Sequence, residues 1–335
     1  MNTDETLAAG VVGVGSMGRH HARVYNEIPG VELAGVADAD EVAAAEVAAE
    51  YSTGFADIGE LLEVVDLVSI AVPTRFHYDV AMQAIEAGVS VLIEKPFVRD
   101  PEDGRELIDR AREVGVQLQV GHIERFNPVV DVLDEVLADL EPIAASARRL
   151  GPPVSRDVED DVVMDLMIHD IDVICSLLDD DVAGVTAIGA SDGDYADAQI
   201  EFAGGTVCSL TASRITQERI RDLSVTTREC HIAVDFMDQS MRIYRHSDPS
   251  YQTNNGDVRY TQESIIERPS IESDEPLKRE LRSFVDCVRT GSTPRITGED
   301  GLRALAIARE ISDIAYSRDL AVEGVSIADG STVRE

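Results

Sequence analysis

Two short segments, far apart in the chain, carry side chains that together could oxidise an alcohol. Glu94-Lys95-Pro96 offers an ammonium group, and Asp165 and His169 lie four residues apart. Side chains at this spacing share one face of a helix, so the carboxylate could fix the tautomer of the histidine and raise its basicity. The histidine could then accept the hydroxyl proton, while the lysine could hold the hydroxyl oxygen or take the proton itself. The residues alone leave both assignments of the general base open.

Lysine is almost absent from the chain, which draws attention to Lys95. Among 29 basic residues only Lys95 and Lys278 are lysines. If selection has removed lysine from the surface, a surviving lysine is expected where arginine cannot replace it. An ammonium group can lose its proton when it is buried, and a guanidinium cannot. This scarcity favours a catalytic Lys95 over an ordinary ion pair.

A glycine-rich turn near the N-terminus predicts a dinucleotide site. Gly13-Val14-Gly15-Ser16-Met17-Gly18 follows an apolar run and opens a helical pattern, which is the context that the G-x-G-x-x-G motif requires. The glycines permit a tight turn and the close approach of a pyrophosphate to a helix N-terminus. Asp38, 20 residues after Gly18, is placed to bind the adenosine ribose. No basic residue follows in Ala39-Asp40-Glu41, so NAD is favoured over NADP.

Further cofactor contacts are expected where the next two apolar runs end. Ala71-Val72-Pro73-Thr74, with His77, follows the run at 67–72, and Glu94-Lys95 ends the run at 89–93. Ligands bind at the carboxyl ends of the strands in open α/β sheets. We therefore expect the NAD site to be lined by Ala71, Pro73, Thr74, His77, Glu94 and Lys95.

The elements that must position these side chains form two predicted domains, residues 1–122 and 123–335. In the first, short apolar runs alternate with helical patterns, which predicts a Rossmann domain with a doubly wound parallel sheet. The strands are expected at Ala8–Val14, Val31–Ala37, Leu67–Val72, Val89–Ile93 and Gln117–Val120, and the helices at Gly18–Glu27, Asp40–Tyr51, His77–Ala87 and Pro101–Val114.

The second domain is predicted to be α+β, with a large, open and mostly antiparallel sheet. A helix is expected at Asn127–Leu140, a strand at Ile143–Arg149 and one long helix at Asp160–Leu178, followed by six short strands between Val182 and Arg245. Met164, Ile168, Ile171, Cys175 and Leu178 recur at helical spacing and should form the buried stripe of the long helix. Residues 246–274 are expected to be polar and irregular. Two closing helices are expected at Pro276–Arg289 and Glu299–Ser317, and they could pack back on the first domain.

Charge restricts the possible partners. The formal net charge is −35, from 29 Lys and Arg against 64 Asp and Glu. Such a field repels nucleic acid and anionic membranes, and its scattered acids are typical of halophilic proteins. No apolar run approaches the roughly 20 residues that span a bilayer, and the polar start is unlike a secretory signal, so we expect a cytoplasmic protein. The four cysteines are too widely spaced for a metal or redox pair, and no metal site is predicted.

The glycine-rich turn, the segment 71–77, Glu94-Lys95-Pro96 and the Asp165-x-x-x-His169 helix together resemble the Gfo/Idh/MocA oxidoreductases over nearly the whole chain. The resemblance implies an NAD cofactor and a catalytic group of Lys95, Asp165 and His169. It also implies homodimers or homotetramers that associate through the face of the second sheet. Members of the family differ on whether lysine or histidine is the base.

A narrower resemblance, to the UDP-N-acetylglucosamine 3-dehydrogenases and related uronate enzymes, is carried by residues 120–128, 149–153, 168–172, 213–216 with 220–221, and 275–278. It implies oxidation of a sugar 3-hydroxyl to a ketone. Independently, a diphosphate needs cations, and arginines cluster on loops and strand ends. A free sugar or inositol dehydrogenase and a non-catalytic NAD-binding regulator are the alternatives. The candidate substrate-binding residues are Arg125, Asn127, Arg149, Arg156, Asp165 and Arg214.

Overall fold

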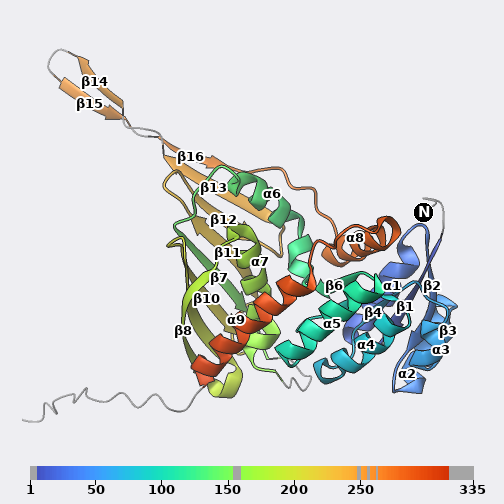
Figure 1. Ribbon diagram of the computed structural model, residues 1–335. Coiled ribbons are helices and arrows are strands. Elements are labelled where there is room, and N and C mark those ends of the chain that lie inside the picture. Colours follow the sequence, from blue (N-terminus) through green and yellow to red (C-terminus); the bar gives the residue numbers. More distant parts are fainter. Residues whose placement is uncertain (1–5, 154–159, 247–249, 255–256, 262, 317–335) are drawn as a thin grey trace, which may run out of the picture.

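The computed structural model describes residues 6–153, 160–246, 250–254, 257–261 and 263–316 (Figure 1). A six-stranded sheet, in the order β3-β2-β1-β4-β5-β6, organises the N-terminal part, and every neighbouring pair is parallel. This confirms the predicted doubly wound sheet, whose order reverses between β1 and β4. Its strands are β1 (Leu7–Val12), β2 (Val31–Ala37), β3 (Gly54–Phe55), β4 (Leu67–Ile70), β5 (Ser90–Glu94) and β6 (Leu118–Gly121).

Helices join these strands, as the alternating pattern predicts. Two small elements were not expected, β3 and the short helix α3, because a two-residue strand and a five-residue helix are too short to show a periodic pattern. The helices are α1 (Ser16–Glu27), α2 (Glu41–Tyr51), α3 (Ile58–Leu62), α4 (His77–Glu86) and α5 (Pro101–Val114).

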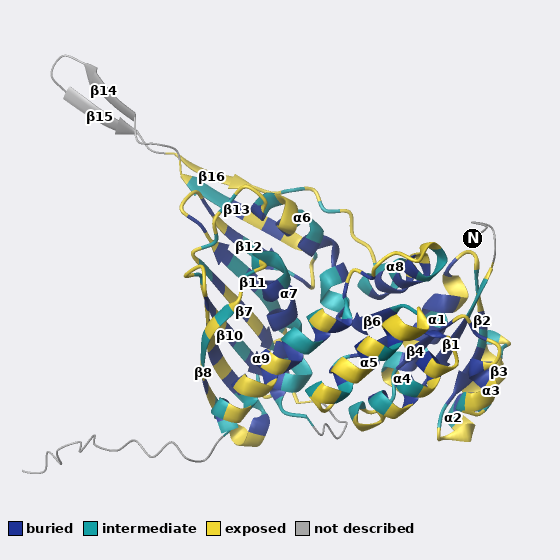
Figure 2. Cartoon of the chain, viewed as in Figure 1, coloured by how far each residue is buried: buried dark blue, intermediate teal, exposed yellow. Residues whose placement is uncertain are grey.

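The second sheet has eight strands in the order β16-β13-β12-β11-β7-β10-β9-β8. Only the β7–β10 pair is parallel, which confirms a mostly antiparallel sheet. Burial alternates along its strands, so one face is covered and the other is open (Figure 2). The strands are β7 (Ala144–Leu150), β8 (Val182–Ala190), β9 (Tyr195–Phe202), β10 (Val207–Ser213), β11 (Ile220–Thr226), β12 (His231–Asp235), β13 (Ser240–His246) and β16 (Ser264–Glu267).

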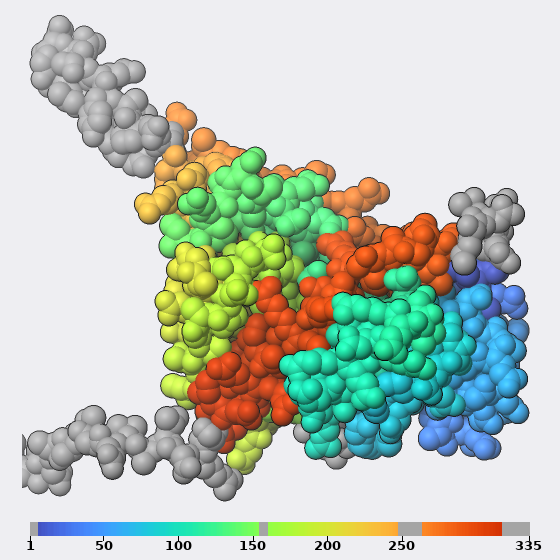
Figure 3. All heavy atoms as spheres, viewed as in Figure 1, coloured from blue at the N-terminus to red at the C-terminus, as the bar shows by residue number. Residues whose placement is uncertain are grey.

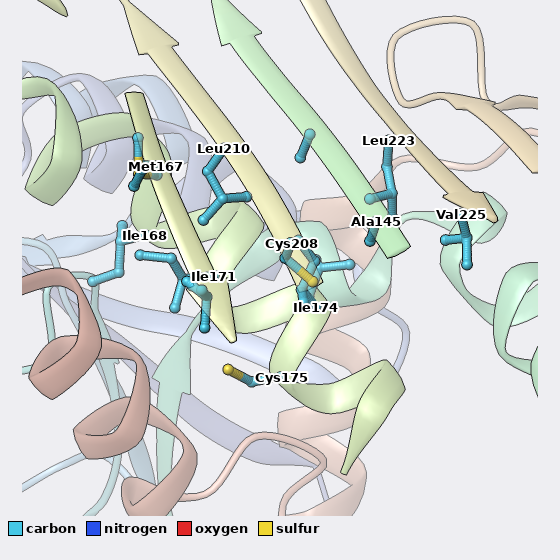
Figure 4. Packing of buried hydrophobic residues seen from close by; sticks show 14 of the residues in the cluster. Ala145, Met167, Ile168, Ile171, Ile174, Cys175, Cys208, Leu210, Leu223 and Val225 are labelled. Carbon is cyan, nitrogen blue, oxygen red and sulfur yellow. The ribbon is translucent and has the colours of Figure 1, made fainter. Parts of the chain in front are cut away.

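Helices α6 (Pro128–Leu137) and α7 (Ile168–Leu178) lie on the covered face of this sheet (Figure 1). Ile168, Ile171 and Cys175 of the predicted apolar stripe are buried, and Met164 and Leu178 are partly buried. Figure 4 shows Met167 near Leu210 and Ile174 near Cys208, and all four belong to one buried cluster. Each fully buried aliphatic side chain contributes roughly 1.5–3 kcal/mol, so this packing fixes the helix on the sheet.

The closing helices α8 (Pro276–Thr290) and α9 (Gly298–Tyr316) return to the first part of the chain, as expected. Helix α8 packs on α1, and α9 contacts α5 on one side and α7 and β8 on the other. In the space-filling view α9 fills the boundary between the two parts of the molecule (Figure 3). Among the described residues, no helix is long and apolar enough to cross a membrane.

Two expectations about secondary structure were wrong. Residues 246–274 are not irregular, because they contain β16, which pairs with β13, and a hairpin of β14 (Ser250–Asn254) and β15 (Asp257–Thr261). Pairing with a neighbouring strand supplies order that a polar composition does not show. The long helix is also interrupted, because its first turn, η3 (Val163–Met167), is π-helical.

Candidate active site

The glycine-rich turn joins β1 to α1 and leaves space that a dinucleotide would fill. A Cβ on Gly13, whose φ is +89°, would lie 2.7 Å from the backbone of Ala71, and one on Gly18 would lie 1.7 Å from the Gly13 oxygen. Gly15 has no neighbouring atom within 4 Å of its Cβ position, and no side chain caps the start of α1. The N–H groups at that helix terminus are therefore available to an anion, so the turn fits a pyrophosphate.

Asp38 follows β2 and lies against the turn. Its Oδ2 accepts a hydrogen bond from the Val14 N–H at 2.6 Å, and its Oδ1 accepts one from the Asp40 N–H at 2.9 Å. The carboxylate thus holds the turn in shape, and each oxygen keeps a lone pair for another donor. This position suits the predicted ribose contact.

The segment after β4 brings Ala71, Pro73 and Thr74 to the same edge of the sheet, where Thr74 begins a short 3-10 turn, η1 (Thr74–Phe76). His77 was expected to line the NAD site, but both of its ring nitrogens contact backbone oxygens of the protein. Its side chain is buried, with Nε2 2.9 Å from the Val72 oxygen and Nδ1 3.0 Å from the Pro96 oxygen. Burial lowers the pKa of His77, so the neutral ring ties together the loops after β4 and β5.

Lys95 lies at the end of β5 and meets the π-helical turn of the second domain. Its Nζ lies 2.6 Å from the carbonyl oxygen of Asp165 and 3.2 Å from the Oδ1 of that residue. The Lys95–Pro96 peptide bond is cis. The side chains of Lys95 and Asp165 are 17% and 14% exposed, so both remain partly accessible.

His169 lies in the first turn of α7 and is partly buried. The orientation of this ring by Asp165 stays a prediction. Asp165 lies in the π-helical turn and bonds Lys95, while Nδ1 of His169 is buried with no hydrogen-bond partner among the described residues. Burial, followed by the positive charges of Lys95 and Arg149, holds the pKa of His169 well below its usual value. The imidazole is therefore neutral near pH 7 and has a lone pair to accept a proton.

Lys95 is adjacent to a group of buried titratable residues. Of these, only Glu94 was predicted from the sequence to have a role. Glu94 accepts the Lys95 N–H at 3.2 Å and lies 2.9 Å from Nε2 of His21 on α1. Burial alone would raise the pKa of Glu94, but the hydrogen bond and charge of His21 and the charge of Lys95 lower it. Glu280 of α8 is fully buried, and no described residue bonds its carboxyl oxygens. Burial, with the charges of Glu94 and Asp172, raises its pKa well above the usual value.

The predicted substrate arginines separate into different environments. Arg149 is 3% exposed, and it forms a bidentate pair with Asp170 and a 2.8 Å contact with Glu124, so it belongs to a buried ion-pair network instead of a sugar site. The resemblance of its segment could not show this, because a buried and an exposed arginine look alike in a sequence.

Asn127 is buried as well, and its side chain caps α6 through the Val129 N–H at 3.3 Å. Nη1 of Arg125 lies 3.6 Å from Oδ1 of the buried Asp172 on α7. Nη1 of Arg214 lies 3.9 Å from Oδ2 of Asp165, the carboxylate that also contacts Lys95. Arg156 lies outside the described residues.

Known protein families and structures resemble both parts of the chain. Residues 7–122 match the family model described as an oxidoreductase family with an NAD-binding Rossmann fold, and residues 130–233 match the Gfo/Idh/MocA C-terminal domain. The chain is 35% identical over 310 residues to UDP-N-acetylglucosamine 3-dehydrogenase from Acidithiobacillus ferrooxidans, covering 91% of this chain and 96% of that protein.

A solved structure of the Acidithiobacillus ferrooxidans enzyme superposes with a TM-score of 0.85 at 34% identity, over 92% of this chain and 97% of that one. The chain is also 27% identical over 321 residues to scyllo-inositol 2-dehydrogenase (NAD(+)) from Bacillus subtilis, covering 89% of this chain and 90% of that protein. The similarity therefore spans both domains.

Proposed function

The chain belongs to the Gfo/Idh/MocA oxidoreductase family and is an NAD-dependent oxidoreductase, and we propose that it oxidises the 3-hydroxyl of a UDP-linked HexNAc sugar to a ketone. The observation that carries the chemistry is the contact between Lys95 and Asp165, beside a neutral His169. The Lys95 Nζ lies 2.6 Å from the carbonyl oxygen of Asp165 and 3.2 Å from its Oδ1. The substrate class rests on the similarity to the enzyme from Acidithiobacillus ferrooxidans.

Each side chain has a distinct part in the proposed reaction. Asp165 holds the Lys95 ammonium group, whose remaining protons can be donated to the substrate oxygen and stabilise the negative charge that develops there. His169 accepts the hydroxyl proton, because its ring is neutral while Lys95 is engaged as a hydrogen-bond donor. The turn at 13–18 and Asp38 hold NAD, which supplies the hydride acceptor when it is bound.

The test is NAD reduction by the purified chain in multimolar KCl, a medium chosen because the net charge is −35. UDP-N-acetylglucosamine, its uronate and free inositol are compared at equal concentration. Formation of NADH with either UDP sugar, together with a 3-keto product found by mass spectrometry, supports the proposal.

A second candidate, a free polyol dehydrogenase, is favoured by the similarity to the Bacillus subtilis enzyme. NADH formation with inositol and with neither UDP sugar would select this candidate and refute the first.

The open face of the eight-stranded sheet is the surface through which we propose that copies of the chain associate as a dimer or tetramer. Burial alternates along β9, so this face is not covered by the helices of the same chain. Light scattering in multimolar KCl measures the mass, and a monomer would contradict the proposal.

A further inference from the structure

A cavity of about 330 Å³ adjoins the catalytic centre on the side of α9. Pro96 and Met164 line it, and these are the chain neighbours of Lys95 and Asp165. Thr74 of η1 forms another part of its wall. The volume lies at the lower end of the range for ligand sites, so the cavity could hold part of a substrate whose reacting hydroxyl lies at Lys95.

Three arginines are among the polar residues that line this cavity. Arg99, after β5, and Arg309, of α9, are both exposed, and Nη1 of Arg309 donates to the Arg99 carbonyl oxygen at 3.5 Å. Arg75 also lines the cavity, and its guanidinium lies over the Phe76 ring. Three arginines therefore reach one cavity from three separate segments of the chain.

Two of these cavity arginines have no carboxylate partner among the described residues, although the chain is strongly acidic. Carboxylates outnumber basic groups by 64 to 29, and Arg125, Arg149 and Arg214 are all paired with acids. In the part of the chain that the structure describes, neither Arg99 nor Arg309 has a carboxylate within 4.0 Å. Asp160 and Asp313 also line the cavity, yet they do not pair with these two arginines.

We propose that this cavity binds the diphosphate of the nucleotide sugar, with Arg99 and Arg309 as its cations. The inference rests on the proposed function and names the residues that distinguish its substrate from a free polyol. The planar guanidinium group matches phosphate oxygens in shape and charge, and an arginine without a carboxylate partner has donors to offer. A free inositol has no group to place there, so the cavity selects for the phosphate-bearing substrate.

The experiment compares Arg99→Gln, Arg309→Gln and the double variant with Arg282→Gln, a control that removes an exposed arginine from α8. Isothermal calorimetry with NAD present measures the affinity for UDP, and steady-state kinetics measure KM and kcat for the UDP sugar. Each cavity variant should weaken UDP binding and raise KM about tenfold, because each removes a charge-assisted hydrogen bond, while kcat stays within about twofold. The affinity for NAD should not change, and the control should behave as the wild type.

The outcomes separate the two proposals. If the wild type oxidises the UDP sugar and the double variant keeps the wild-type affinity for UDP, the cavity is not the diphosphate site, and the proposed function stands. If the wild type oxidises inositol alone and does not bind UDP, both proposals fail. Inorganic pyrophosphate provides a second readout, since it should inhibit the wild type competitively against the UDP sugar and lose that effect in the double variant.

Discussion

Replacing Glu280 by glutamine should make the protein less sensitive to alkaline pH. The side chain of Glu280 is 0% exposed on α8, and no described residue bonds either carboxyl oxygen. Burial and the charges of Glu94 and Asp172 raise its pKa well above the usual value, so the folded chain holds a neutral carboxylic acid where the unfolded chain holds a carboxylate.

The sign of the effect follows from proton linkage. A raised pKa in the folded state contributes stability that is complete below the usual value of about 4.3 and is lost as the pH rises toward the folded pKa. Each pH unit within that window costs about 1.4 kcal/mol. Between pH 6 and pH 8 the wild type should therefore lose up to about 3 kcal/mol from this residue alone.

The amide of Glu280→Gln has nearly the same shape and does not ionise, so this loss should disappear. Urea unfolding at pH 6 and pH 8 in multimolar KCl measures the free energy of unfolding, and Glu135→Gln, an exposed site on α6, is the matched control. The stability difference between Glu280→Gln and the wild type should shift in favour of the variant by up to about 3 kcal/mol as the pH rises. Equal pH dependence of the two proteins would show that Glu280 is ionised in the folded chain and would refute the reasoning.

The remaining predictions concern the catalytic centre and its supports. Lys95→Ala should lower kcat by about 10²–10⁴-fold, while the NAD affinity measured by calorimetry stays nearly intact. A comparable loss of NAD binding would mean that the role of Lys95 is misassigned. Asp38→Ala should reduce the preference for NAD over NADP in kcat/KM, and an unchanged ratio would exclude the ribose contact. Because the pKa of His169 is lowered, the acidic limb of the kcat/KM profile should lie below pH 6.5, and a limb at or above that value would contradict its assignment as the base. Arg149→Met should destabilise the fold by about 3–5 kcal/mol in urea unfolding, because it leaves the Asp170 charge buried without a partner, and a loss of sugar affinity alone would restore its role in substrate binding.

Much of the fold could be predicted because its signals are local. Apolar runs of strand length, separated by helical patterns and glycine stops, indicated both sheets, and Lys95 could be placed at a ligand edge from the end of one such run. The irregularity at Val163–Met167 could not be predicted, since a π-helical turn depends on packing more than on residue type. This turn carries Asp165, whose carboxylate bonds Lys95.

Burial of polar residues was the other source of error. Glu280 lies between Leu277 and Leu281 and one turn before Phe284, and these three side chains are buried on the same helix. That spacing could have indicated a buried acid. For Arg149 and His77 no comparable signal exists, because their partners, Asp170 and the Pro96 carbonyl oxygen, come from other parts of the chain.

The position of α9 also has a consequence for how an active molecule is made. The glycine-rich turn, Asp38 and Lys95 all precede the end of β6 in the chain and are synthesised before the second domain. A nascent first domain could therefore bind NAD without being able to oxidise a substrate. Helix α9, which contacts α5, α7 and β8, is translated after every strand of both sheets. Chains truncated before α9 should therefore bind NAD and stay inactive, because they lack the helix that contacts both parts of the molecule.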